Sequence, residues 1–282
     1  MRIAAFGDIH SNHIALEACL DKLEQIGADG IVFLGDYVSD CACPQKTMEL
    51  LRKAAEKYRC WFIRGNREEY MIDHADGKNV WENNSQSGSV LYTYENLTAE
   101  DIDWFRSLPI SMKVEMEGAP AFEICHGGHS RSRLMLLPGR EEFDEELALM
   151  ETDLMLCAHT HKSFIGEKNG KTIVNGGCVG LPGLDGEGYT GATFAVIDLI
   201  EGKWVPQLMR ADYDTEAVIR EFHESGFMER GHVWAKTVTK TLRTGEYYTL
   251  KCIDLVNQYV KETGLPFETE EHWQWAAMAL NL

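Results

Sequence analysis

Seven side chains that can bind a metal ion come directly after short apolar segments of the sequence. Asp8 and His10 follow the first such segment, residues 3–6, and are only two positions apart. At an extended strand end, residues two apart leave on the same face, so this pair is expected to form one half of a chelate. The rest of the chain must supply the other half. The seven candidates are Asp8, His10, Asp36, Asn66, His126, His159 and His161.

The donor atoms of these candidates indicate which metals they suit. All seven offer a carboxylate or amide oxygen or an imidazole nitrogen, and none offers a thiolate. Such a set suits manganese, iron or zinc and does not suit copper(I) or an iron–sulfur cluster. A single aspartate or histidine in a loop is more often a helix cap or a surface residue. The prediction of a metal site therefore depends on five strand ends that all carry a candidate.

The segments that must position these candidates alternate between strand and helix patterns. Apolar segments at 3–6, 30–34 and 60–63 are separated by helical spacing at 15–23 and 44–55. This alternation is typical of an α/β fold with a parallel sheet, in which sites gather at the carboxyl ends of the strands. Further strands are expected at 110–116, 121–125, 154–157, 164–165, 172–174, 192–199 and 203–210, and a helix at 141–150.

The sequence loses its strand patterns after residue 211. Helices are expected near 214–224, 232–242, 246–263 and 269–280. We therefore expect a core domain at 1–211 and a helical C-terminal extension at 212–282 packed on that core. These helices could cap the metal site, pair subunits or pack on the sheet, and the sequence leaves their role and the oligomeric state open.

Composition and charge exclude several classes of function. The 282-residue chain has a net charge of -18, which would repel a phosphate backbone, so broad nucleic-acid binding is not expected. No apolar segment approaches the roughly twenty residues that span a bilayer, so no membrane insertion is expected. Eight scattered cysteines without a signal peptide favour reduced thiols, and we expect a cytoplasmic protein.

The candidate ligands lie in motifs that together resemble the calcineurin-like metallophosphoesterase superfamily. The motifs occur in the order and spacing of that family, and they are Gly7-Asp8-Ile9-His10, Gly35-Asp36, Gly65-Asn66, His126-Gly127 and His159-Thr160-His161. The resemblance implies a four-layer α/β/β/α sandwich that holds two divalent metal ions, manganese, iron or zinc. It also implies which residues hold each ion: Asp8, His10, Asp36 and His161 for the first, and Asp36, Asn66, His126 and His159 for the second.

In this family the metal ions carry the chemistry. Two cations roughly 3.5–4 Å apart can lower the pKa of a shared water enough to form hydroxide at neutral pH, and can clamp a phosphate for in-line attack. No side-chain nucleophile is needed, which agrees with the lack of a convincing serine or cysteine triad in the sequence. The resemblance thus implies a hydrolase in which a metal-bridging hydroxide attacks phosphorus, with Asp36, Asn66, Arg67 and His126 as catalytic residues.

Arg67 departs from the family pattern. Many members have a histidine at this position, which contacts the phosphate and can assist the leaving group. A guanidinium does not donate a proton at neutral pH, but it can stabilise the charge of a phosphate. Arg67 therefore favours substrates with a good leaving group, such as a phosphoanhydride or a nucleotide. The alternative is that Arg67 forms a surface ion pair with Glu68 or Glu69, which would contribute little.

The expected substrate is a small phosphodiester or phosphoanhydride, including nucleotides. Arg131 and Arg133 are further candidates for substrate binding, or else solvated partners of Glu141 or Glu142. The chain is similar to small bacterial members that cleave phosphodiesters or dinucleoside polyphosphates such as diadenosine tetraphosphate. The alternatives are a non-catalytic metal-binding module, a phosphomonoesterase or a phosphoprotein phosphatase. The last is disfavoured because the second motif departs from that group's pattern at Ser39-Asp40.

Overall fold

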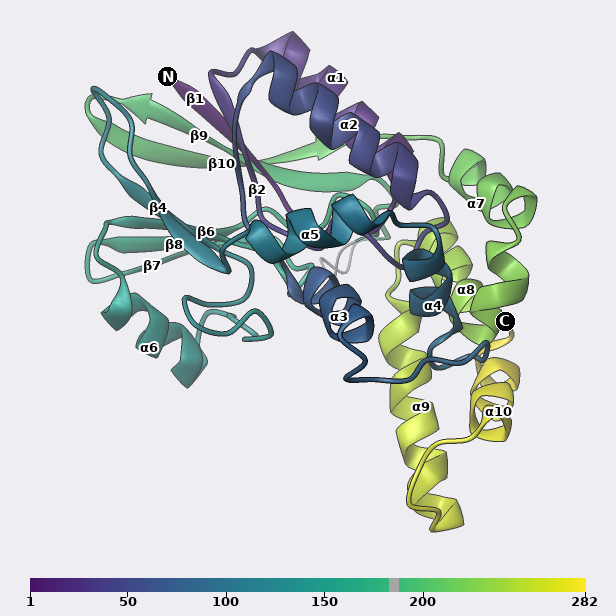
Figure 1. Ribbon diagram of the computed structural model, residues 1–282. Coiled ribbons are helices and arrows are strands. Elements are labelled where there is room, and N and C mark those ends of the chain that lie inside the picture. Colours follow the sequence, from purple (N-terminus) through teal and green to yellow (C-terminus); the bar gives the residue numbers. More distant parts are fainter. Residues whose placement is uncertain (183–187) are drawn as a thin grey trace.

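The computed structural model describes residues 1–182 and 188–282. This part of the chain forms two five-stranded sheets, with strand orders β10-β9-β1-β2-β3 and β4-β5-β6-β8-β7 (Figure 1). The first sheet contains β1 (Arg2–Phe6), β2 (Gly30–Phe33), β3 (Arg59–Phe62), β9 (Ala192–Ile200) and β10 (Lys203–Ala211). The second contains β4 (Ser111–Val114), β5 (Phe122–Cys125), β6 (Leu154–Cys157), β7 (Phe164–Lys168) and β8 (Lys171–Asn175).

Six helices accompany the two sheets within the described residues that precede the C-terminal segment. Pro44 is the first residue of α2, where a missing N–H costs no hydrogen bond, and Thr98 caps α5 by accepting from the backbone N–H of Asp101. The helices are α1 (His13–Ile26), α2 (Pro44–Lys57), α3 (Asn66–Ala75), α4 (Gly88–Glu95), α5 (Ala99–Ser107) and α6 (Glu141–Leu149).

Three apolar cores separate four layers. Ala4 and Phe6 of β1 pack in a core with α1 and α2, whereas Ile3 and Ala5 of the same strand pack in a second core against the other sheet. Because β1 is covered on both faces, its apolar residues follow one another without the polar alternation of a half-exposed strand. A third core, which includes Phe143, places α6 on the outer face of the second sheet. The predicted α/β/β/α sandwich is confirmed.

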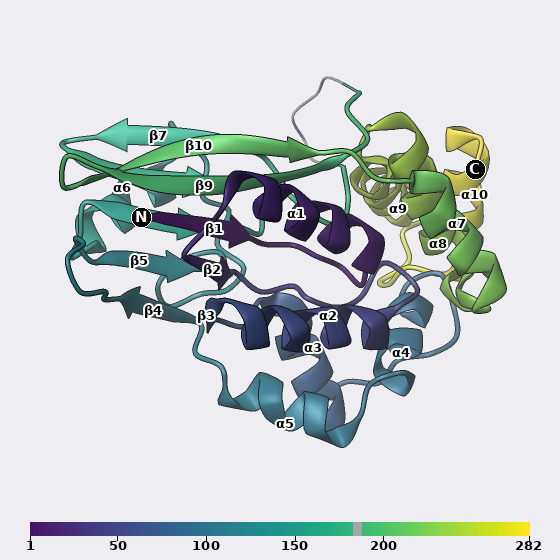
Figure 2. The ribbon, with the colours of Figure 1, turned by 90° about the horizontal axis from the view of Figure 1, so that it is seen from above.

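The parallel strands of both sheets end at the same side of the molecule. β1, β2 and β3 pair in parallel, as do β5, β6 and β8. Seen from above, the arrows of β1 and β2 point toward the C-terminal helices (Figure 2). The segments that follow these strands, which carry the candidate ligands, therefore meet beside those helices.

The C-terminal segment is helical, as predicted. It contains α7 (Thr215–Glu224), α8 (Phe227–Thr244), α9 (Tyr248–Thr263) and α10 (Glu270–Leu280). The second helix, predicted near 232–242, follows a kink at His232, which has φ 48°. A short helical segment from Phe227, after Gly226 with φ 77°, precedes this kink and was not predicted. None of the helices in the two described ranges is long and apolar enough to cross a membrane.

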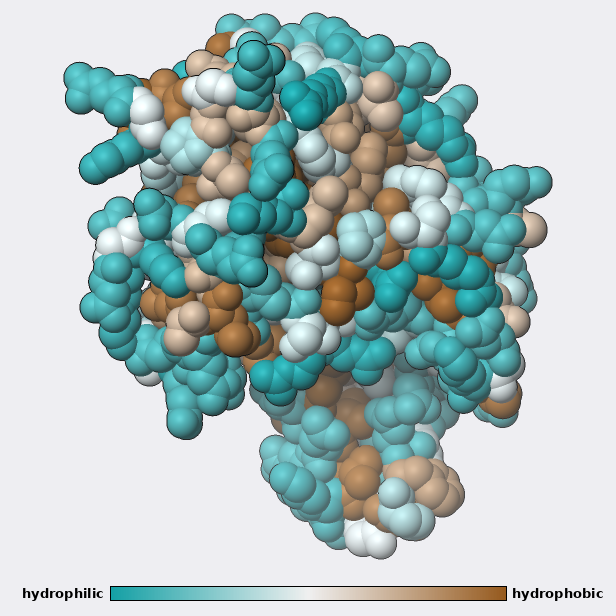
Figure 3. Space-filling view, turned by 60° about the vertical axis from the view of Figure 1, so that its left-hand side comes forward, coloured by the Kyte–Doolittle hydropathy of each residue, from teal (hydrophilic) through white to brown (hydrophobic). Residues whose placement is uncertain are grey.

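The face of the molecule in Figure 3 is mainly hydrophilic, and the exposed apolar side chains include some near the end of α9. This end protrudes from the rest of the molecule and carries apolar patches (Figures 1 and 3). Leu265 and Phe267, which follow α9, are 43% and 64% exposed. The boundary between a core domain at 1–211 and an extension at 212–282 stays a prediction, since shared cores also join the C-terminal helices to earlier elements.

Candidate metal centre

The structure brings all seven predicted ligands together at the carboxyl ends of the strands. Six of the seven are buried, and His159 is partly exposed. They come from five places in the chain: Asp8 and His10 after β1, Asp36 after β2, Asn66 at the start of α3, His126 after β5, and His159 and His161 after β6.

The backbone of the first two ligand segments runs side by side. The N–H groups of Asp8 and His10 donate to the carbonyl oxygens of Gly35 and Asp36, at 3.1 and 2.9 Å. Asp8 and His10 have φ values of 55° and 50°, so the expectation that they leave an extended strand on one face was wrong. They converge because the chain turns after β1 ends at Phe6.

Five of the seven predicted ligands have a left-handed backbone. Such a conformation costs a residue other than glycine on the order of 1–3 kcal/mol and persists only where the surrounding structure imposes it. Conformations of this kind cluster at active sites and ligand clamps. The five residues, with φ between 50° and 68°, are Asp8, His10, Asp36, His159 and His161.

Two glycines of the motifs are required by close approach. A Cβ atom on Gly65 would lie 2.3 Å from Oδ1 of Asp36 and 2.9 Å from Cε1 of His126. Gly35 has φ +90°, and a Cβ there would lie 2.3 Å from the backbone nitrogen of Gly65. Only glycine lets the loops after β2 and β3 touch while the ligands stay in place.

Asp8 lies at the centre of three imidazole nitrogens. Its Oδ1 is buried and has no hydrogen-bond partner, yet Nε2 of His161, His126 and His10 lie 3.6, 3.9 and 4.0 Å away. The other oxygen, Oδ2, accepts from the backbone N–H of His159 at 3.0 Å. Burial raises the pKa of Asp8 to about 6, because burial disfavours the charged form of a carboxylate. A cation among these atoms would favour the charged form, so the geometry and the charge both fit a bound metal.

Asp36 and His126 form the second part of the cluster with Asn66. Nε2 of His126 lies 3.4 Å from Oδ1 of Asp36 and 3.2 Å from Oδ1 of Asn66. Burial alone would lower the pKa of His126, but Asp36 and Asp8 outweigh it and raise that pKa to about 10. Nδ1 of His126 lies 2.7 Å from the carbonyl oxygen of Leu34, which leaves Nε2 to face the carboxylates.

Burial favours the neutral form of the remaining two histidines. Burial, helped by the charge of His126, lowers the pKa of His159 to about 4, and burial lowers that of His161 well below its usual value. A neutral imidazole has the free lone pair that a metal requires. Nε2 of His161 lies 3.0 Å from Nε2 of His10, and two ring nitrogens at this distance can point at one ion.

Arg67 does not form the surface pair with Glu68 or Glu69 that was the alternative to a role in the site. Its Nη2 lies 2.9 Å from Oδ2 of Asp40, and its Nε lies 4.0 Å from Oδ2 of Asp36. Only 18% of the side chain is exposed. The guanidinium therefore lies beside the predicted bridging carboxylate, where a phosphate could meet it.

Two buried carboxylates near the centre were not predicted from the sequence. Oδ2 of Asp40 contacts Arg67 and lies 3.0 Å from Nδ1 of His10, and Oδ1 accepts from Nε1 of Trp234 at 2.8 Å. Glu68 is fully buried and accepts three backbone N–H groups at 2.8 Å, those of Asp36, Tyr37 and Gly65. The only signals in the sequence are the spacing from Asp36 to Asp40 and the position of Glu68 in the first turn of α3.

Arg131 and Arg133 are both exposed, and neither lines the cavity over the metal centre. The guanidinium of Arg133 stacks on the ring of Tyr70 at 4.5 Å, and that of Arg67 approaches the same ring at 5.6 Å. Tyr70 does line the cavity, so Arg133 lies just outside it. The substrate-binding roles of both arginines stay predictions.

Cys178 lies close to His10 and His161, and the backbone engages its sulfur. Its Sγ donates to the carbonyl oxygen of Asp8 at 3.0 Å and accepts from the backbone N–H of Leu181 at 3.2 Å. Burial raises the pKa of this thiol well above its ordinary value, which disfavours the thiolate that a metal would bind.

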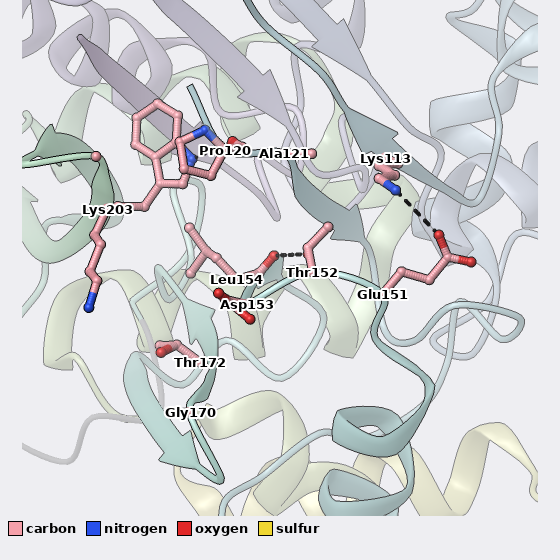
Figure 4. Close-up of a pocket in the computed structure, with 12 residues that line it drawn as sticks. Lys113, Pro120, Ala121, Glu151, Thr152, Asp153, Leu154, Gly170, Thr172 and Lys203 are labelled. Carbon is pink, nitrogen blue, oxygen red and sulfur yellow. Dashed lines mark hydrogen bonds and ion pairs between the residues drawn. The ribbon is translucent and has the colours of Figure 1, made fainter. Parts of the chain in front are cut away.

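A second cavity, of about 450 Å³, lies at the other end of the sheets (Figure 4). It is lined by Asp153 and Leu154 at the start of β6 and by Gly202 in the turn after β9. Lys113 and Glu151 form an ion pair there at 3.4 Å. The described residues that line it include no histidine and no cysteine. The cavity over the metal centre, of about 310 Å³, is therefore the better candidate for a catalytic site.

Comparison with known families agrees with this geometry. Residues 1–202 match the calcineurin-like phosphoesterase superfamily domain. The chain belongs to this superfamily. The matched region contains all seven predicted ligands, and metal-dependent hydrolysis of phosphoesters is the activity that membership indicates. The match ends before the four C-terminal helices.

Several relatives of this superfamily member have related sequences or structures. The chain is 25% identical over 230 residues to an uncharacterized protein of Methanocaldococcus jannaschii, which covers 75% of this chain and 88% of that protein. A metallophosphoesterase of Sphaerobacter thermophilus has the same fold, with TM-score 0.68 and 21% identity over 87% of this chain and 100% of the other. A hypothetical protein of Pyrococcus horikoshii gives TM-score 0.72 and 19% identity over 86% and 98%.

Proposed function

We propose that this superfamily member is a two-metal phosphoesterase that hydrolyses a small phosphodiester or a phosphoanhydride of the nucleotide type. One ion, manganese, iron or zinc, would be held by Asp8, His10, Asp36 and His161, and a second by Asp36, Asn66, His126 and His159. When bound, two such ions activate water as the nucleophile and neutralise charge on the phosphate.

The observation that carries this proposal is the environment of Asp8. Oδ1 of Asp8 is buried without a hydrogen-bond partner, and the Nε2 atoms of His10, His126 and His161 lie around it at 3.6–4.0 Å, so a metal ion held among these atoms would supply the partner that this oxygen lacks. The donor atoms are oxygens and imidazole nitrogens, which suit the three metals named.

Arg67 supports the phosphate-binding part of this proposal and the kind of leaving group that it names. Burial opposes the charge of Arg67, but Asp40 and Asp36 outweigh it and raise its pKa above the ordinary value. The guanidinium therefore stays a cation that can bind a phosphate but cannot give a proton to the departing oxygen. This supports substrates whose leaving group departs as an anion, such as an aryl ester or an anhydride.

Hydrolysis of bis-p-nitrophenyl phosphate by the full chain, with metal content measured on the same samples, tests the proposal. We expect turnover that chelation abolishes and added Mn²⁺ restores. The matched control is Asp103→Asn, since Asp103 is 82% exposed on α5. Full metal occupancy without hydrolysis of monoester, diester or dinucleotide substrates would overturn the proposal and leave a non-catalytic metal-binding module. Hydrolysis of p-nitrophenyl phosphate alone would indicate a phosphomonoesterase.

A further inference from the structure

The cavity over the metal centre is lined by two chemically different groups of residues. Predicted ligands, among them His10, Asp36 and His161, form one group. The cavity measures about 310 Å³, which is more than a phosphate needs and lies at the lower end of small-molecule sites, roughly 300 Å³. The second group is apolar or aromatic and consists of Tyr70, Met135, Trp234, Tyr247, Leu250 and Ile253.

Three of these residues lie at the start of α9. Leu250 and Ile253 are three apart in the helix, so their side chains are neighbours on its surface, and Tyr247 is the residue directly before the helix. The ring of Tyr247 meets the ring of His161 at 5.3 Å and 62°, so the start of α9 lies directly beside a predicted ligand. The helix therefore presents an apolar surface to whatever group the substrate carries next to its phosphate.

Trp234 adds a rigid aromatic surface from α8. Its Nε1 donates to Oδ1 of Asp40 at 2.8 Å, which fixes the indole in the cavity wall. A fixed aromatic ring can stack on a planar group with little loss of entropy on binding. Leu250 and Met135, which line the cavity from α9 and from the loop before α6, are 42% and 39% exposed and can lose this exposure when a ligand binds.

The cavity offers little positive charge from the chain. Among the described residues that line it, Arg67 is the only lysine or arginine, and Asp40 pairs with it at 2.9 Å. Arg133 stacks on Tyr70 outside the lining. A chain of several phosphates would lie against apolar side chains with few cations to neutralise it, which is unfavourable. A single phosphate with an apolar substituent matches the two groups of lining residues.

We infer that this site takes a phosphodiester whose phosphate carries an aromatic or bulky apolar group. This group would lie against Trp234, Tyr247, Leu250 and Ile253. The inference rests on the proposed function and narrows its substrate class away from polyphosphates. It also gives the C-terminal helices a role, since all four of these residues lie after residue 211.

The first test measures binding without turnover. Phenylphosphonate and methylphosphonate carry the same charged group, and calorimetry compares their affinities for the Mn²⁺-loaded protein. We expect phenylphosphonate to bind about tenfold more tightly or better, because it buries a ring of apolar surface. In the variant with both Leu250→Ala and Ile253→Ala, the ratio of the phenylphosphonate affinity to the methylphosphonate affinity should fall to about threefold or less, since much of the apolar contact is gone. The control is Leu265→Ala, which changes an exposed residue beyond α9 and should leave this affinity ratio unchanged.

The second test measures turnover with a constant leaving group. Methyl p-nitrophenyl phosphate and phenyl p-nitrophenyl phosphate release the same leaving group, p-nitrophenolate. A difference in their kcat/KM therefore reports how well the site accepts the other substituent, methyl or phenyl. We expect the phenyl diester to be preferred about tenfold, mainly through a lower KM. Equal kinetics and equal phosphonate affinities, or a higher kcat/KM for diadenosine tetraphosphate, would overturn the inference. Selective binding of phenylphosphonate without any hydrolysis would instead contradict the proposed function.

Discussion

Oδ2 of Asp40 lies 3.0 Å from Nδ1 of His10, on the side of the ring that faces away from the metal centre. Nε2 of the same ring faces Asp8 and His161. A carboxylate at the second nitrogen fixes the orientation of a metal-binding histidine and makes it a better ligand. Asp40 also contacts Arg67 and Trp234, so one side chain joins a predicted ligand, the predicted phosphate-binding cation and the C-terminal helix α8.

Replacing Asp40 by asparagine should weaken metal binding. Loss of such an outer partner typically costs about 10–100-fold in metal affinity, and we expect a loss in this range for Mn²⁺, measured by calorimetry. Trp234→Phe keeps the aromatic ring and removes only the hydrogen bond to Asp40, so it should have a smaller effect. Unchanged affinity in a folded Asp40→Asn variant would show that His10 is held by other contacts.

Replacing Asp36 by asparagine should abolish nearly all activity. Asp36 is predicted to bridge both ions, and one of its oxygens also accepts from the backbone N–H of Arg67 at 2.8 Å. An amide has no charge to share between two cations, so we expect metal content to fall together with turnover. Elemental analysis and a diester assay on the same samples measure both. The control Asp103→Asn should retain both, and activity in Asp36→Asn would contradict the bridging role.

Replacing Arg67 by alanine should lower kcat/KM for phosphodiesters by about 100-fold or more, the usual cost of losing one group that stabilises transition-state charge. Arg67→Lys should recover only part of this, because an ammonium lacks the planar pair of donors. Arg59→Ala, at the exposed start of β3, is a control without an expected effect. A kinetic profile of Arg67→Ala equal to that of the wild type would mean that the guanidinium serves only to neutralise Asp40.

The pair of His129 and Glu146 predicts a pH dependence of stability. Nδ1 of His129 lies 2.5 Å from Oε2 of Glu146, and this contact raises the pKa of His129. Burial tends to raise the pKa of Glu146, but His129 outweighs it and the net shift is downward. A raised histidine pKa stabilises the fold below about pH 6.5 and loses this effect as the pH rises through the folded-state value. The glutamate's contribution is present above about pH 4.3 and is lost as the pH falls.

The free energy of unfolding should therefore differ most between wild type and His129→Gln near pH 5.5, by less than about 1 kcal/mol because the pair is partly solvated. Denaturant titrations at several pH values measure this difference under equal metal conditions. Glu145→Gln, an exposed neighbour on α6, removes a charge without touching the pair. A difference that stays constant from pH 5 to 8 would contradict the shift of His129.

The gathering of the seven candidate ligands could be predicted from the sequence because each candidate follows a strand. Gly35 and Gly65 lie at the two places where only a glycine fits between the loops that carry the candidate ligands. Each glycine directly precedes a candidate in the sequence, so a short motif reveals it. The convergence of Asp8 and His10 was also predicted, but its cause was not. A turn with positive φ values brings the two side chains together, whereas the prediction assumed an extended strand. Sequence patterns describe which residues follow one another, and they identify a site well when the site is built from strand ends.

The surroundings of the ligands could not be predicted because they depend on contacts between distant segments. Trp234 and Asp40 form a hydrogen bond although they are 194 positions apart in the sequence, and no local pattern in either segment predicts this contact. Glu68 looks like an ordinary acidic residue in the first turn of a helix, yet it is buried beneath Asp36. The cavity wall formed by α9 could not be predicted from the sequence either, since apolar residues such as Leu250 and Ile253 occur in any amphipathic helix.

Replacing Phe227 by alanine should test whether the C-terminal helices fold with the core. Phe227 is fully buried in α8, and its ring contacts those of Tyr92 in α4 and Phe222 in α7 at 5.1 and 4.9 Å. Losing a buried phenylalanine costs about 3–5 kcal/mol. If 212–282 folds together with 1–211, fluorescence and circular dichroism should report one urea transition that shifts as a whole. Met278→Ala, 68% exposed on α10, should shift nothing. Two transitions, of which only one moves in Phe227→Ala, would show that the extension unfolds separately from the metal centre.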